Sequence, residues 1–151
     1  MTKHETIRKL LSDYADVCSS ITNDPYNISK LTDFICNKSA DGLRSDLIRL
    51  VILSNGGKLA SKFPSIEELL VGDIKEMMNT VVDILLEHNP KSFKSYIEYF
   101  SGLGLEIIGI VDDGDTVSYA VMNVFSPTTN SKVVTTFKII LENDEWKVST
   151  I

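Results

Sequence analysis

The chain of 151 residues has only two cysteines, two histidines and one tryptophan, and its 15 basic side chains are outnumbered by 21 acidic ones. The resulting net charge of −6 argues against a nucleic-acid partner, since such binders usually present a basic face, and against docking on anionic lipid. Apolar runs such as residues 50–53 are far shorter than the roughly 18 residues of a membrane span. Because no secretory signal is visible either, we expect a cytoplasmic protein without a membrane partner.

Motifs for metal binding and catalysis are also missing. His4 and His88 each stand without a second ligand at zinc-site spacing, so we expect no metal. No Gly-x-Ser-x-Gly elbow occurs, and the glycine pairs lack the spacing of a phosphate or dinucleotide loop. Cys18 and Cys36 are expected to be reduced, partly buried side chains. The sequence thus favours a protein that is not an enzyme and has no cofactor, and it indicates no catalytic residue.

Residues 1–102 show helical periodicity, because apolar side chains recur at three- and four-residue spacing. The predicted helices cover about residues 7–21, 29–36, 43–51, 66–88 and 90–100. Thr2 with Glu5, and Ser65 with Glu68, make possible capping boxes before the first and the longest of them. Asn55-Gly56-Gly57 and Ser101-Gly102 are expected stops, and Asn89-Pro90 is an expected start.

After Gly104 the period changes to two, which predicts strands at 105–111, 116–125, 132–141 and 146–151. Short turn-rich segments separate them, as in an antiparallel meander. Helices first and strands last indicate an α+β fold, a single domain over residues 1–151 with a helical part (1–102) packed on a four-stranded antiparallel meander (103–151). The first strand carries Leu105, Ile107 and Val111 on one expected face and Ile108 and Ile110 on the other, so a sheet-on-sheet homodimer is one way to cover the second face.

The end of the chain resembles a known fold family. After the strand at 137–141, the run Glu142-Asn143-Asp144-Glu145-Trp146-Lys147-Val148 is similar to the last turn and strand of NTF2-like (cystatin-like) domains. The resemblance covers the C-terminal third and the first helix, whereas residues 28–100 hold more helix than such folds usually carry. The family hosts enzymes, binders and immunity proteins, so the resemblance does not choose a function.

The resemblance implies a pocket between the helices and the concave face of the sheet. Tyr14, Tyr119 and Asn123 are the residues that we expect to line it, in a protein that binds a small molecule and resembles an isomerase or lyase. Acid–base chemistry in such a pocket needs a carboxylate or histidine, and none lies in the alternating apolar faces of the second and third strands. The alternative is that both tyrosines belong to the core with their hydroxyls at its rim.

Charge position is the most informative feature. Residues 103–151 hold three basic and seven acidic side chains, and six of the acids lie in two turns: Asp112, Asp113, Asp115, Glu142, Asp144 and Glu145. In a meander the first and third turns fall at one end of the sheet, roughly 10 Å apart. Such a patch attracts a basic partner and raises its association rate. The plainer interpretation is that Asp, Asn and Gly are simply what hairpin turns use.

Small size, acidity and the lack of catalytic motifs make the bulk properties similar to those of bacterial toxin-immunity proteins. Our leading hypothesis is therefore a non-enzymatic acidic binding protein that neutralises a basic protein partner, such as a toxin nuclease, through the six carboxylates. The alternatives are the NTF2-like small-molecule pocket protein and a homodimeric interaction domain.

Overall fold

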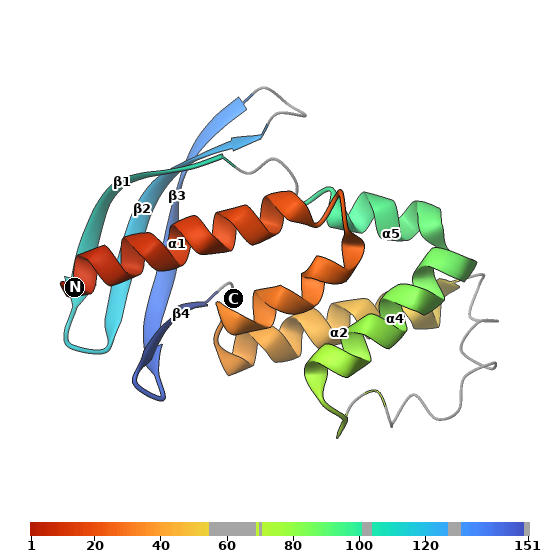
Figure 1. Cartoon of the computed structure of the whole chain (residues 1–151). Coiled ribbons are helices and arrows are strands. Elements are labelled where there is room, and N and C mark those ends of the chain that lie inside the picture. Colours follow the sequence, from red (N-terminus) through yellow and green to blue (C-terminus); the bar gives the residue numbers. More distant parts are fainter. Residues whose placement is uncertain (55–68, 70, 101–103, 127–130, 150–151) are drawn as a thin grey trace.

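The structure is a computed structural model that describes residues 1–54, 69, 71–100, 104–126 and 131–149. Its helices are α1 (Lys3–Ser20), the 3-10 helix η1 (Pro25–Asp33), α2 (Asn37–Leu53), α4 (Ile74–His88) and α5 (Pro90–Ile97). The strands are β1 (Gly104–Asp113), β2 (Val117–Ser126), β3 (Ser131–Glu142) and β4 (Glu145–Ser149). They form one antiparallel sheet in the order β1-β2-β3-β4 (Figure 1), which confirms the predicted α+β fold with a C-terminal meander.

Helix α1 begins at the predicted capping box. The Thr2 hydroxyl accepts a hydrogen bond from the Glu5 amide at 3.2 Å, and the Thr2 amide donates to the Glu5 carboxylate at 3.1 Å. Buried side chains then follow at three- and four-residue spacing, at Ile7, Leu11, Tyr14 and Cys18. This stripe lies against one face of the sheet, which α1 crosses (Figure 1). We name that face the inner face and the opposite one the outer face.

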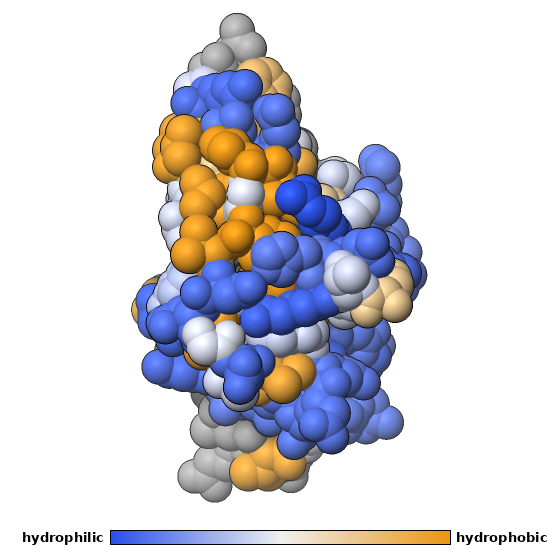
Figure 2. Space-filling model, turned by 90° about the vertical axis from the view of Figure 1, so that its left-hand side faces the viewer, coloured by the Kyte–Doolittle hydropathy of each residue, from blue (hydrophilic) through white to orange (hydrophobic). Residues whose placement is uncertain are grey.

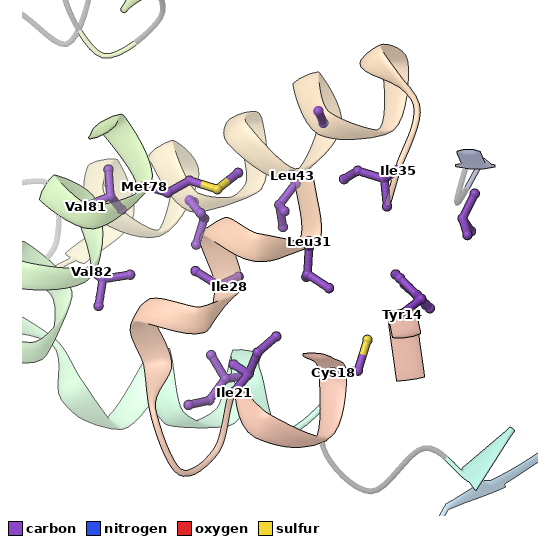
Figure 3. Close-up of a cluster of buried hydrophobic side chains, with 14 of the residues drawn as sticks. Tyr14, Cys18, Ile21, Ile28, Leu31, Ile35, Leu43, Met78, Val81 and Val82 are labelled. Carbon is purple, nitrogen blue, oxygen red and sulfur yellow. The ribbon is translucent and has the colours of Figure 1, made fainter. Parts of the chain in front are cut away.

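The remaining helices extend the hydrophobic core beyond the sheet. Side chains from α1, η1, α2 and α4 point toward one another there (Figure 3). Ile28, Leu47 and Val82 have no exposed surface at all. Full burial of such a side chain contributes about 1.5–3 kcal/mol to the free energy of unfolding, so this packing fixes the helical half.

Residues 34–36 connect the two halves. The Cys36 amide donates to the Val148 carbonyl at 2.9 Å, and the Val148 amide donates to the Phe34 carbonyl at 2.8 Å, so this segment extends the β4 edge in parallel. The predicted helix at 29–36 is therefore wrong in its position. Asp24 caps the Tyr26 amide and Pro25 starts the 3-10 helix earlier, which leaves the last residues free to pair with β4.

The predicted long helix at 66–88 is also wrong as a single element. The chain leaves helical geometry at Gly72, and α4 starts anew after Asp73, whose carboxylate accepts from the Glu76 amide at 3.2 Å. Pro90 opens α5 as predicted. The expected capping box at Ser65 and Glu68 and the expected helix stops at 55–57 and 101–102 lie outside the described residues.

The two faces of the sheet differ in environment. Ala120, Met122 and Ile139 of the inner face are fully buried against the helices, and their neighbours in sequence point outward. A bulge between Ile107 and Gly109 shifts the register of β1 by one residue. Leu105, Ile107 and Ile110 therefore pack inward, whereas Val111 points outward. The expected faces of Ile110 and Val111 are thus wrong, since strict alternation takes no account of an extra residue.

Candidate functional site

The β1–β2 and β3–β4 turns lie at the same end of the sheet (Figure 1), as the meander order requires. Both turns are tight. Gly114 has a φ of 77° in the first turn, and Asn143 and Asp144 have φ values of 52° and 64° in the second. Left-handed residues of this kind form the short hairpin loops that match strand twist. The six predicted carboxylates therefore belong to one end of the molecule, which we name the acidic end (Asp112, Asp113, Asp115, Glu142, Asp144 and Glu145).

Three of the six carboxylates are engaged within the chain. Asp112 lies 3.2 Å from Lys3 Nζ and 3.0 Å from His4 Nε2, and it accepts from the Ser118 hydroxyl at 2.9 Å. The Ser118 hydrogen bond, followed by the contacts with His4 and Lys3, holds the pKa of Asp112 below its usual value. This carboxylate therefore fastens the start of α1 to the β1–β2 turn.

The other two engaged carboxylates lie at the β3–β4 turn. Glu142 accepts from the Asn37 amide at 3.0 Å, at the first residue of α2, where a negative charge is favourable. Glu145 pairs with Lys147 at 3.0 Å. Lys147 also donates to the Asp33 carbonyl at 2.6 Å, so this turn is tied to both η1 and α2.

Asp113, Asp115 and Asp144 differ from the first three. All are exposed, and within the described chain no hydrogen bond or ion pair satisfies their carboxylates. Lys3 and His4 lie at this end too, and sequence reasoning missed them because they are more than 100 residues from Asp112 in the chain. The charge available to a partner thus comes chiefly from the three unpaired aspartates.

The three residues predicted to line a pocket do not meet. Tyr14 is buried on the inner face, where its ring meets Phe137 edge-on at a centroid distance of 6.4 Å. Tyr119 and Asn123 alternate with the buried Ala120 and Met122, so they lie on the outer face. Asn123 donates there to Glu106 at 3.5 Å. The predicted set is therefore wrong, because the sequence pattern of β2 does not say which of its faces meets the helices.

A different pocket, of about 340 Å³, lies among α1, η1, α2 and α5. Its lining is Tyr14, Leu31, Ile35, Ser39, Gly42, Leu43, Asp46, Tyr96 and Phe100. Burial raises the pKa of the Tyr14 and Tyr96 hydroxyls, and the Asp46 charge adds to the effect on Tyr96, so both phenols stay protonated donors. Asp46 is the one carboxylate among these lining residues.

No group of three or more potential metal ligands forms within the described residues. Within the described residues, the helices are too short or too polar to cross a membrane. Comparisons with protein-family models, curated proteins and solved structures find no match for the chain. The geometry alone must therefore support a function.

Proposed function

We propose that this protein is a non-enzymatic binding protein whose acidic end holds a basic protein partner. The observation that carries the proposal is the placement of Asp113, Asp115 and Asp144, unpaired, in two turns at one end of the sheet. Because no lysine of the described chain pairs with these three carboxylates, their negative electrostatic potential acts on an approaching molecule. A field of this sign speeds the encounter with a basic surface and disfavours acidic ones.

An immunity protein that blocks a toxin nuclease is the concrete form of this function. A nuclease must present basic side chains to the phosphates of its substrate, and that surface is what an acidic inhibitor can recognise. The engaged carboxylates also support the proposal, since Asp112 and Glu142 tie the two turns to α1 and α2. Turns that are held in place before binding lose less conformational freedom when the partner arrives.

The test compares two variants with the same change of net charge. The tip variant, Asp115→Lys/Asp144→Lys, reverses two charges of the acidic end. The control variant, Asp41→Lys/Glu87→Lys, reverses the charges of two exposed acidic side chains on α2 and α4. Asp113 is left unchanged because it also borders the outer face. Each protein is co-expressed with the products of neighbouring genes. A captured protein is identified by mass spectrometry, and its binding kinetics are measured at two salt concentrations.

We expect the tip variant to lose about tenfold or more in association rate and most of the salt dependence, because steering depends on these charges. The control variant should bind like the parent protein. A basic partner that binds the tip variant as fast as the parent, or the absence of any basic partner, would contradict the proposal.

The pocket among the helices favours a second candidate function, the binding of a small organic cation. Asp46 supplies a negative charge, and the rings of Tyr96 and Phe100, 5.6 Å apart, supply faces for a cation–π contact. The test is a thermal-shift screen that pairs primary and quaternary amines with neutral isosteres. Stabilisation by the amines should disappear in Asp46→Asn and persist in Asp41→Asn, and equal shifts from the neutral isosteres argue against this function.

A further inference from the structure

The outer face of the sheet is apolar and uncovered within the described chain. Ile108, Val111 and Val134 are 56%, 58% and 64% exposed, and Phe125 is 41% exposed. Figure 2 shows hydrophobic side chains gathered over the sheet, with hydrophilic ones below them. Large apolar side chains scattered singly are ordinary on a surface, but a contiguous group on one face of a sheet is typical of an interaction site.

Charged side chains border this apolar group in a definite pattern. Asp113 lies on the β1 side and Lys138 on the β3 side of the outer face, at adjacent rows of the sheet. Neither side chain has a hydrogen bond or ion pair to another described residue, whereas the side chains of Glu106 and Lys132 pair with each other at 3.5 Å. The face therefore has an unpaired acid at one flank and an unpaired base at the other.

We propose that this outer face packs against the same face of a second copy of the chain. A two-fold axis lying in the interface along β2 places β1 of one copy over β3 of the other. Asp113 of each copy then comes within reach of Lys138 of its partner, and the apolar side chains of the two faces meet between these pairs. Aligned sheet packing of this kind crosses the strands at about 30°. An axis perpendicular to the strands places β1 over β1 and brings like charges together, so the charge pattern selects the first arrangement.

The size of the outer face limits the area that the dimer can bury. Strands of ten residues are about 33 Å long, and three of them cover a width of about 14 Å, so the face spans roughly 500 Å² in each copy. A dimer that buries about 1,000 Å² in total lies at the small end of specific interfaces. We therefore expect a reversible dimer whose population depends on protein concentration.

Adjacent valines on β3 provide a matched test. Val134 (64% exposed) lies on the outer face, whereas Val133 (58% exposed) lies on the inner one. Light scattering and sedimentation over a range of concentrations should show that Val134→Glu raises the dimer dissociation constant by about tenfold or more, since it buries an unpaired charge. Val133→Glu should leave the constant unchanged. A parent protein that is monomeric throughout, or a dimer that tolerates Val134→Glu, overturns the proposal.

A charge exchange tests the arrangement itself. Asp113→Lys and Lys138→Asp should each weaken self-association, because each places like charges opposite one another in both pairs. Mixing the two variants should restore the dimer, since a heterodimer has two attractive pairs. If the mixture associates no better than either variant alone, the proposed register is wrong. Asp115 and Asp144 are unchanged in these variants, so the outcome is independent of the test of the acidic end.

Discussion

The helical half and the sheet use their side chains in different ways. Among the described residues, most of the fully buried apolar side chains belong to the helices and to η1, whereas the sheet contributes only Ala120, Met122, Ile139 and Val148. Strand β1 contributes none, although it is ten residues long. The helical half is therefore held by side-chain packing, and the sheet by its backbone ladder and one covered face. A sheet that does not need its outer face for its own core has that face available for another molecule.

The largest expected effect on stability comes from truncating one phenylalanine in each half of the molecule. Phe93 on α5 has no exposed surface, and Phe125 on β2 is 41% exposed. Phe93→Ala should lower the free energy of unfolding by about 3–5 kcal/mol, because it leaves a cavity in a packed core. Phe125→Ala should cost about 1 kcal/mol or less in the monomer.

Urea unfolding measures both variants. Far-UV circular dichroism follows the helices, and the fluorescence of Trp146, the one tryptophan of the chain, follows β4. Equal losses for the two variants would mean that the sheet depends on side-chain packing as much as the helices do, which contradicts the comparison.

Sequence patterns predicted most helices and strands because the interactions that define these elements join residues close together in the sequence. The α1 capping box, Pro90 at the start of α5 and the alternation in all four strands involve neighbours in sequence. The errors arose where a distant partner or a single extra residue decided the outcome. Residues 34–36 pair with β4, more than 100 residues away, and the bulge at Ile107 and Gly109 reverses the faces of Ile110 and Val111.

The candidate site was predictable in the same partial way. Meander order alone brings the two acidic turns to one end, so their meeting followed from the strand pattern. Which carboxylates stay unpaired did not follow, because it depends on where α1 and α2 begin relative to the turns. Tyr119 was misplaced for a related reason, since the apolar side chains on both faces of β2 conceal which face the helices cover.

A second prediction concerns the interior of the helical half. Burial raises the pKa of the Cys18 thiol to about 11, despite its hydrogen bond with Tyr14. The unfolded chain, with an ordinary value near 9, loses this proton first. Stability from the protonated thiol is therefore complete below pH 9 and declines as the pH rises toward 11. At pH 9.5 the loss should be roughly 1 kcal/mol.

Cys36 is the matched control because it lies at the junction with the sheet. Burial alone raises the pKa of its thiol, but the hydrogen bonds with Ser39 outweigh this and lower it. Urea unfolding at pH 7 and pH 9.5 should show that Cys18→Ala removes most of the alkaline loss and Cys36→Ala does not. A parent protein with the same stability at both pH values would show that the Cys18 thiolate is tolerated within this core.

The smallest expected effect concerns the polar connection between the two halves. The pKa of Asp112 is lowered, first by the Ser118 hydroxyl and then by His4 and Lys3. Its contribution to stability is therefore complete above the ordinary value of 3.8 and is lost as the pH falls through the lower folded-state value. Thermal unfolding should show Asp112→Asn slightly less stable than the parent at pH 7, with the difference closing in acid.

Asp115→Asn, which removes an unpaired carboxylate from the same turn, should match the parent at every pH. If Asp112→Asn also matches the parent, the buried side chains of α1 and the Lys3 hydrogen bond to the Gly114 carbonyl (3.3 Å) are enough to hold the start of α1 to the sheet. In that case the contacts of Asp112 with Lys3 and His4 are an exposed ion pair that contributes little to the free energy of unfolding.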